Sequence, residues 1–290
     1  ENLILDRNTQ VNLELTEPSG TSLYSVLNRC RTPMGKRGLR EWIMAPLRDL
    51  EQIGRRQDSI EILLSDKKTA ARLRGLLCQC RDMSKSISRI TLRMGSPADV
   101  LAVKDTLNLL PEIKTLAASQ PALAVWDEAP DLSCLSSALN AAVADTVPRL
   151  VRDGGFVRPG YDAKLDEWRD KAAHSEDWLA KFEERERQRT GIKTLKAGVN
   201  KVFGYYIEIG KGSADKAPLD YTRKQTLVNA ERYITEELKS FERDMFSAEG
   251  EIQAIEERIY EEIKLKILSE SAAVQSAAKF LSTLDILLSL

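Results

Sequence analysis

The chain contains few of the residues that build most metal and redox sites. Its 290 residues include a single histidine, His174, and four cysteines. One histidine cannot form a histidine-rich metal site, and we predict that His174 is a solvated residue of a charged helix. Cys78-Gln79-Cys80 lacks the two-residue spacer of a zinc or redox pair. We therefore expect a reducing compartment and buried structural thiols at Cys30, Cys78, Cys80 and Cys134.

Sequence patterns of catalysis are missing as well. There is no Gly-x4-Gly-Lys-Ser/Thr phosphate loop, and Gly210-Lys211-Gly212 does not have its spacing. No motif surrounds a nucleophile, and we interpret the acid pairs Glu183-Glu184 and Glu256-Glu257 as solvated helix faces. This chain is therefore predicted not to be an enzyme. It also lacks an apolar run as long as a membrane span, which favours a soluble, cytoplasmic protein.

Positive charge is concentrated in one segment of the chain. The whole sequence has a net charge of −1. Residues 185–232 carry eleven lysines and arginines against five acids, a surplus of six, so the remainder carries −7. Such a patch is typical of proteins that bind nucleic acid, an anionic membrane or an acidic protein. A merely solvated surface fits the charge equally well.

Two stretches have the apolar spacing of a coiled coil. Steps of three and four residues alternate along each, which is the 3.5-residue repeat of paired helices. The first stretch has Leu165, Trp168, Ala172, Ser175, Leu179 and Phe182, and the second has Ile234, Leu238, Phe241, Met245, Ala248, Ile252, Ile255 and Ile259. We predict a lever of two helices. The small residues Ser175 and Ala248 leave open whether it includes a flexible point.

The residues before the first stretch are predicted to form a helical bundle. Val11–Leu15 has the pattern of an extended segment, and the first twenty residues look like part of a longer polypeptide. From Ser22 the pattern is helical, with helix starts at Thr32-Pro33 and at Asp49. The buried stripe of the second of these helices is expected at Ile53, Ile60, Leu63 and Leu64. Prolines are expected to divide the rest into shorter helices, at Pro97, Pro111, Pro121, Pro130 and Pro148.

Between the two stretches the pattern changes from helix to short strands. The outgoing helix is expected to end near Arg189, at Thr190-Gly191. Strand-like pieces follow at 193–200, 202–210 and 221–226, with a turn at Asn200-Lys201, which suggests a small antiparallel sheet. Tyr205 and Tyr206 alternate faces on a strand, so at most one of them faces outward.

The returning helix is predicted to begin after Asn229 as its N-cap, with Glu231 in its first turn. If it continues to Leu268, it is about 60 Å long. Basic and amide side chains gather on the preceding strands and turns, where backbone N–H groups are also available. We expect these groups to hold the sugar-phosphate backbone of a nucleic acid without reading its sequence. The candidate contacts are Lys196, Asn200, Lys201, Arg223, Lys224 and Asn229, with Lys193 nearby.

Two long motifs at this tip resemble the clamp strands of the bacterial MutS mismatch-repair family. They are Leu195–Ile209, with the sequence LKAGVNKVFGYYIEI, and Arg223–Leu238, with the sequence RKQTLVNAERYITEEL. Two further stretches resemble the same family in the same order. Thr32–Asp49 looks like the start of its core, and Arg152–Arg169 looks like the beginning of its lever.

The resemblance covers essentially the whole chain and implies a mainly α fold. We expect a helical bundle core, two long lever helices and a small antiparallel β-containing clamp inserted at their tip. The implied division has four parts: 1–20 as the end of a connector, 21–178 as the core bundle with the outgoing lever helix, 179–238 as the clamp, and 239–290 as the returning lever helix and core.

The resemblance also implies a function. In that family, clamps close over duplex DNA and levers relay the state of the DNA to ATPase domains. ATP and Mg would belong to an ATPase domain that this chain lacks, so we expect no cofactor here. The implied partners are duplex DNA, a second MutS copy through other domains, and MutL, at the nucleoid. Val228 stands where some relatives have lysine, which puts one phosphate contact in doubt.

Two other interpretations remain open. The chain could be a helical scaffold whose basic tip binds an acidic protein, in which case duplex DNA would not compete with that partner. It could also belong to a MutS-like paralogue that acts in recombination. One branch of those paralogues lacks the clamp, so the clamp motif disfavours that branch and leaves the others open.

Overall fold

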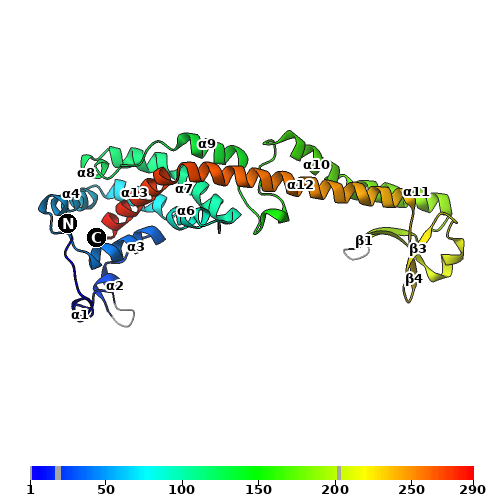
Figure 1. The fold of residues 1–290 in the computed structure, drawn as a ribbon, viewed down its shortest axis with the longest axis horizontal. Helices are drawn as coiled ribbons and strands as arrows, with labels where there is room; N and C mark the ends of the chain where they lie inside the picture. Colours follow the sequence, from blue (N-terminus) through cyan, green and yellow to red (C-terminus); the bar gives the residue numbers. More distant parts are fainter. Residues whose placement is uncertain (1, 17–20, 201–203) are drawn as a thin grey trace. The chain divides into compact units, whose positions relative to one another are not determined.

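The computed structural model describes residues 2–16, 21–200 and 204–290, and the chain divides into two compact units (Figure 1). Unit 1 is Glu1–Arg158 with Ile259–Leu290, and unit 2 is Pro159–Arg258. The described chain is mainly helical with one four-stranded antiparallel sheet, which confirms the predicted fold class. The four functional segments implied by the resemblance stay a prediction.

Unit 1 is a helical bundle in which α13, Ser271–Ser289, contacts α3, α4, α5 and α6. Most residues of α13 are buried, and they form the centre of the apolar core. Its other helical segments are α1 (Arg7–Asn12), α2 (Leu23–Leu27), α3 (Pro33–Met44), α4 (Leu50–Ser65), α5 (Lys67–Leu77), α6 (Met83–Thr91), α7 (Pro97–Ala118), α8 (Pro121–Ala124), α9 (Ser133–Ala142), the 3-10 helix η1 (Val151–Asp153) and the last turns of α12 (Glu236–Ser269).

The N-terminal segment is helical where the sequence pattern predicted an extended chain. α1 includes Val11, and the cause is a local cap at its start. The Asp6 carboxylate accepts hydrogen bonds from Thr9 N at 3.0 Å and from Thr9 Oγ1 at 2.7 Å. An N-cap of this kind satisfies the otherwise unpaired first N–H groups of a helix. The prediction of an extended Val11–Leu15 segment is therefore wrong.

The predicted helix starts are confirmed, whereas one predicted break is wrong. Thr32 caps α3 with Pro33 at its first position, and Asp49 caps α4. Pro111 lies inside α7 and does not divide it. Buried Leu110 and Ile113 anchor the helix on both sides of this proline, and such tertiary packing overrides local propensity.

Burial differs from the predictions at a few surface positions. Leu63 of α4 is buried, but Leu64 is exposed and does not belong to the stripe. Cys30 and Cys80 are buried as predicted, whereas Cys78 and Cys134 are exposed. Both exposed thiols lie at helix ends, Cys78 as the C-cap of α5 and Cys134 in the first turn of α9, where packing is incomplete.

A buried carboxylate fixes the start of α3 within unit 1. Asp285 of α13 is 1% exposed and accepts hydrogen bonds from Arg31 N at 2.9 Å and from both Thr32 N and Thr32 Oγ1 at 2.7 Å. A Cβ at Gly35 would overlap this carboxylate, so only glycine permits the close approach. The charge of Asp285 is thus matched by donors, as burial of a charged group requires.

Unit 2 contains α10 (Ala163–Ala173), α11 (Ser175–Thr190) and most of α12. None of the predicted seam residues is exposed, which confirms the coiled-coil spacing, although Ile234 lies in a strand. α11 ends at Thr190 with Gly191 in the left-handed conformation at φ 67°, as predicted. The outgoing helix is interrupted at His174, which ends α10 and precedes α11, so His174 is not a residue within one continuous helix.

The sheet of unit 2 has the strand order β1-β2-β4-β3, with every neighbouring pair antiparallel. Its strands are β1 (Lys196–Asn200), β2 (Gly204–Gly210), β3 (Thr222–Thr226) and β4 (Ala230–Ile234), and the 3-10 helix η2 (Lys211–Lys216) follows β2. The first three strands match the predicted pieces. β4 was missed, because its residues were assigned to the returning helix.

The start of the returning helix is therefore a correction. α12 begins at Glu236, and its cap is Thr235, whose Oγ1 accepts a hydrogen bond from Leu238 N at 3.1 Å. Asn229 instead lies in the hairpin between β3 and β4, and Glu231 lies in β4. Residues 230–234 stay extended because they pair with β2 on one side and with β3 on the other. The 34 residues of α12 give a helix of about 50 Å.

Candidate nucleic-acid interface

The sheet has one buried side and one solvent-facing side. On β2, Ile207 and Ile209 are buried, so Tyr206 and Glu208, which alternate with them along the strand, point to the opposite side. The buried side forms a small apolar core with α11 and the start of α12, made of Phe182, Ile192, Leu195, Ile207, Ile209, Tyr221, Tyr233, Ile234 and Leu238. This core determines which side chains of the sheet remain available to a ligand.

Arg232 of β4 organises the solvent-facing side. Its Nε donates to Glu208 Oε2 at 2.9 Å, and its Nη1 donates to Gln225 Oε1 at 3.1 Å. Its guanidinium carbon lies 4.0 Å from the centroid of the Tyr206 ring. The Tyr206 ring also covers Gly198 of β1, where a Cβ would come within 3.1 Å of it. Tyr206 is thus already packed by protein groups and does not present an open ring for base stacking.

Tyr205 points to the other side of β2, which confirms that at most one of the two tyrosines faces outward. Its ring packs edge-on against Phe241 with centroids 5.1 Å apart. Burial raises the pKa of the Tyr205 hydroxyl. Phe241 in turn stacks on Trp178 at 3.7 Å, so α11 and α12 are joined by aromatic contacts beside the sheet.

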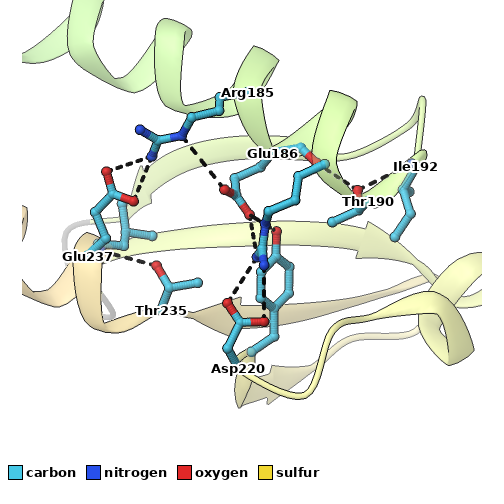
Figure 2. A network of polar contacts seen from close by, with 10 residues as sticks. Arg185, Glu186, Thr190, Ile192, Asp220, Thr235 and Glu237 are labelled. Atoms are coloured by element: carbon cyan, nitrogen blue, oxygen red, sulfur yellow. Dashed lines mark hydrogen bonds and ion pairs between the residues drawn. The ribbon is translucent and has the colours of Figure 1, made fainter.

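A polar network joins α11 to the segment before β3 and to the start of α12 (Figure 2). Its centre is Glu186, which is 4% exposed and accepts hydrogen bonds from Arg189 Nη2 and from Tyr221 Oη, both at 2.7 Å. Arg189 Nη2 also donates to Asp220 Oδ2 at 3.0 Å, and Arg185 Nη2 donates to Glu237 at 2.6 Å.

Two pKa shifts follow from this network. Burial, followed by the hydrogen bond to Glu186, raises the pKa of Tyr221. The hydrogen bonds to Glu186 and then Asp220 raise the pKa of Arg189. The tyrosine therefore stays protonated and the arginine charged at neutral pH, and the network holds the sheet against its helices.

The predicted contact residues do not gather in one cluster. Lys196 is the first residue of β1 and lies opposite Glu208 in the β1–β2 register. Asn229 precedes Ala230, which lies opposite Gly210, so Lys196 and Asn229 are at the same end of the sheet. We call this the Asn229 end. Asn200 pairs with Gly204 and lies at the opposite end. Lys201 lies outside the described residues.

Arg223 and Lys224 of β3 already have acidic neighbours. Arg223 Nη1 lies 3.2 Å from Glu231 Oε1, and Lys224 Nζ lies 3.8 Å from Glu242 Oε2. A hydrogen bond from the Tyr233 hydroxyl lowers the pKa of Glu231, so this carboxylate is ionised at neutral pH. Both basic side chains therefore lie at the protein surface, and their acidic neighbours offset part of their positive charge.

The basic residues of 185–232, with Arg223 and Lys224 included, divide into a set that forms ion pairs and a set that does not. Ion pairs to acids engage Arg185, Arg187, Arg189, Arg223, Lys224 and Arg232. Across the part of the chain that the structure describes, no ion pair involves the exposed residues Lys193, Lys196, Lys211 and Lys216. Lys211 N donates to Asn229 O at 3.1 Å, which places Lys211 at the Asn229 end.

Lys211 and Lys216 contribute to the predicted charge surplus of 185–232, but they are not among the contacts predicted from the sequence. The sequence spacing of these lysines does not predict where they lie on the sheet, because that position depends on how η2 packs along β2 and β4. The acids that form ion pairs with Arg223 and Lys224 were not predicted from the sequence either. Glu242 is 18 residues from Lys224, and only the fold brings the two side chains together.

Two acids that we expected on solvated helix faces are engaged instead. Glu256 is fully buried and accepts a hydrogen bond from Arg169 Nη2 at 2.6 Å. Glu183 accepts a hydrogen bond from Ala197 N at 2.6 Å and pairs with Arg187. The prediction is wrong at these two positions, because a facing helix or strand supplies a donor. Their neighbours Glu184 and Glu257 are exposed, as expected.

The structure offers no metal centre within the described ranges 2–16, 21–200 and 204–290: no group of three or more His, Cys, Asp or Glu could hold an ion. Over the same ranges, no helix combines the length and the apolar content needed to cross a membrane. Among the described residues of unit 2, the groups that a ligand can contact include exposed lysine ammonium groups, side-chain amides and the backbone at the ends of strands.

Two comparisons with known proteins agree on one family. A family model described as MutS domain III matches residues 8–290. The chain is also 38% identical, over 294 residues, to the DNA mismatch repair protein MutS of Salinibacter ruber. That match covers 98% of this chain and 32% of the relative, so the chain spans about a third of the relative's length.

Proposed function

The chain belongs to the MutS family, whose domain III it matches, and on that basis we propose that its sheet holds the backbone of duplex DNA. The observation that carries this proposal is the set of four exposed lysines without ion pairs around the sheet: Lys193, Lys196, Lys211 and Lys216. Ammonium groups of this kind neutralise phosphates and contribute affinity without sequence information.

The paired side chains of β3 can add to this contact. Arg223 and Lys224 are exposed, whereas the side chains of their acidic partners Glu231 and Glu242 are only 14% and 17% exposed. A phosphate group can therefore approach the two basic groups from the solvent side while they keep their acidic neighbours. The face around Arg232 and Tyr206 is internally satisfied, which supports backbone contact over base reading.

A salt titration of duplex binding tests the proposal. With four neutralised phosphates, log K is expected to fall against log salt with a slope of about −3.6, with equal affinity for matched and G·T-containing duplexes. Lys196→Ala/Lys211→Ala should reduce the slope to about −1.8. The matched control Lys67→Ala/Lys68→Ala removes the same charge from α5 of unit 1 and should change nothing. A slope near zero, or equal loss in the control, would contradict the phosphate contacts.

We further propose that α10, α11 and α12 act as a lever that couples the DNA-bound state to an ATPase domain elsewhere in the parent protein. Two contacts within unit 2 support a firm connection between the helices: the Trp178–Phe241 stack and the buried pair Arg169–Glu256. Ile252→Pro in the full-length parent should uncouple DNA binding from ATP turnover, because a proline inside a helix costs ~3 kcal/mol or more. Unchanged coupling would contradict the lever.

The small residues Ser175 and Ala248 allow an alternative in which the lever bends at a flexible point. A groove of about 730 Å³ lies at the α10–α11 interruption, lined among others by Trp168, His174, Met245 and Ala248. Trp178 and Phe241 line the same groove, so the stack lies at its wall, and the empty volume beside the interruption supports bending at this point. We also propose that the parent protein has two partners, MutL and a second copy of itself, and that it acts at the nucleoid in the cytoplasm.

A further inference from the structure

Unit 1 contains a cavity that holds an arginine without a charged partner. The cavity has a volume of about 340 Å³ and is lined by side chains of α3, α4 and α13 and of the segment after α8. Its walls include Trp42, Arg56, Trp126 and Lys279. It is remote from the sheet in sequence and plays no part in the proposed DNA contact.

Arg56 is the unusual residue of this cavity. Its guanidinium carbon lies 3.3 Å from the centroid of the Trp42 ring, and its Nε is buried without a hydrogen-bond partner. Among the described residues, no acid forms an ion pair with it. Burial lowers the pKa of Arg56 to about 10. Arg56 is half-buried, and a charge that is even partly withdrawn from water without a partner is costly, so such arginines are normally paired.

The neighbouring charges do not supply that partner. Arg55 also lines the cavity, and it pairs with Glu51 of the same helix. Glu128 is the acid on the cavity wall, and it lies 3.9 Å from Lys279 Nζ, with both side chains more than three-quarters exposed. The cavity therefore carries more positive than negative charge, and its innermost cation is the unmatched one.

The walls of the cavity are rigid enough to present this charge. Trp126 Nε1 donates a hydrogen bond to Ser59 Oγ at 2.9 Å, and Ser59 in turn donates to Ala122 O at 2.7 Å. The Arg56 guanidinium carbon lies 3.3 Å from the centroid of the Trp42 ring. A planar guanidinium is suited to two parallel hydrogen bonds to a carboxylate or phosphate.

We propose that this cavity binds an oxyanion, a carboxylate or a phosphate group, that completes the pairing of Arg56. Two sources have this chemistry. One is an acidic side chain from protein outside this chain, since the chain spans 32% of its relative's length. The other is a small free anion, for which the volume lies at the lower end of the range for ligand sites.

The four tryptophans of the chain allow a direct test. Trp42 and Trp126 line the cavity, whereas Trp168 and Trp178 lie in unit 2 and serve as internal controls. The indole N–H signals of the ¹⁵N-labelled chain are followed during titration with sodium acetate and with sodium phosphate, against sodium chloride at matched ionic strength. Saturable shifts at Trp42 and Trp126 alone are expected. Saturation at lower acetate than phosphate indicates an acidic side chain as the source, and the reverse indicates a free phosphate.

Two variants make the test specific. Arg56→Gln should abolish the saturable shifts, and the matched control Arg72→Gln, at an exposed arginine of α5 that does not line the cavity, should keep them. A second readout is the Tm: acetate or phosphate should raise the Tm of the unaltered chain by more than that of Arg56→Gln, because binding to the folded state stabilises it, whereas general salt effects act on both proteins alike. The proposal is overturned if neither anion gives a saturable shift, if all four tryptophans respond alike, or if Arg56→Gln keeps the response.

Discussion

The two units of this chain are held together in different ways. Unit 1 is built around α13, a largely buried apolar helix, and one of its buried charges, Asp285, is matched by three donors at the start of α3. The sheet of unit 2 has a smaller core and depends on ion pairs centred on Glu186 and Arg232. The comparison indicates that unit 1 is a stable frame, whereas unit 2 responds more strongly to salt and to ligands that compete for its charges.

The largest effect is expected from Asp285→Ala in unit 1. Removal of this buried carboxylate leaves the Arg31 and Thr32 donors without partners, and we expect a loss of about 3 kcal/mol or more in the free energy of unfolding. Urea unfolding, followed by the indole N–H NMR signals of Trp42 and Trp126 in unit 1, measures it. Asp58→Ala on the exposed face of α4 is the control and should lie within about 0.5 kcal/mol of the parent. Equal loss in both variants would contradict the role of Asp285.

The corresponding change in unit 2 is Glu186→Gln. A neutral amide cannot replace the carboxylate that Arg189 and Tyr221 share, and we expect a loss of about 2 kcal/mol confined to the sheet. Hydrogen exchange of 196–234 should accelerate, while exchange in α13 stays unchanged. Glu184→Gln, at the exposed neighbouring position, is the matched control. If α13 accelerates equally, the two units are not independent in stability and the comparison fails.

Alkaline pH sharpens the comparison, because both units contain a buried tyrosine. Burial raises the pKa of Tyr260 in unit 1 and of Tyr233 in unit 2 to about 12. A raised pKa means that the folded state holds the proton more tightly, so this stabilisation is complete below pH ~10 and is lost as the pH rises towards 12. Both units should therefore weaken between these values.

Tyr260→Phe separates the unit 1 contribution. It removes the hydrogen bond to Gly95 O at 2.8 Å, which should cost about 1 kcal/mol at neutral pH and flatten the alkaline decline of unit 1. Tyr161→Phe, at an exposed position, is the control. An unchanged alkaline decline in Tyr260→Phe would assign that decline to other groups.

The smallest effect is a gain of stability in unit 2. Gly250 lies inside α12, and a Cβ there would meet nothing within 4 Å. Gly250→Ala should therefore stabilise the helix by about 1 kcal/mol, measured as a rise in Tm. Gly204→Ala is expected to have the opposite sign, because Gly204 has φ +69° and its Cβ would overlap the Glu242 carboxylate. Loss of stability in Gly250→Ala would mean that the helix needs flexibility there.

Features with a local cause could be predicted from the sequence. The coiled-coil spacing, the caps Thr32 and Asp49, and the end of α11 at Gly191 each depend on residues within a few positions of one another. β4 could not be predicted, because Ala230–Ile234 has no strong strand pattern and becomes extended by pairing with β2 and β3. Asn229 was placed at a helix start for the same reason.

The candidate interface shows the same limit. The sequence identifies where positive charge is concentrated, but which charges remain available depends on contacts between distant residues. Glu242 beside Lys224 and Asn229 beside Lys211 are brought together by the fold. The unpaired Arg56 could not be singled out either, because its neighbour Arg55 has the same charge and only burial distinguishes the two.

Hydrogen exchange of the 290-residue chain with and without duplex DNA at low salt is the most direct test of the central claim. We expect slower exchange in β1, η2 and the β3–β4 hairpin, and unchanged exchange in α13 and the rest of unit 1. A duplex that binds, as shown by a mobility shift, but protects unit 1 and leaves the sheet unchanged would contradict the assignment of DNA contact to unit 2.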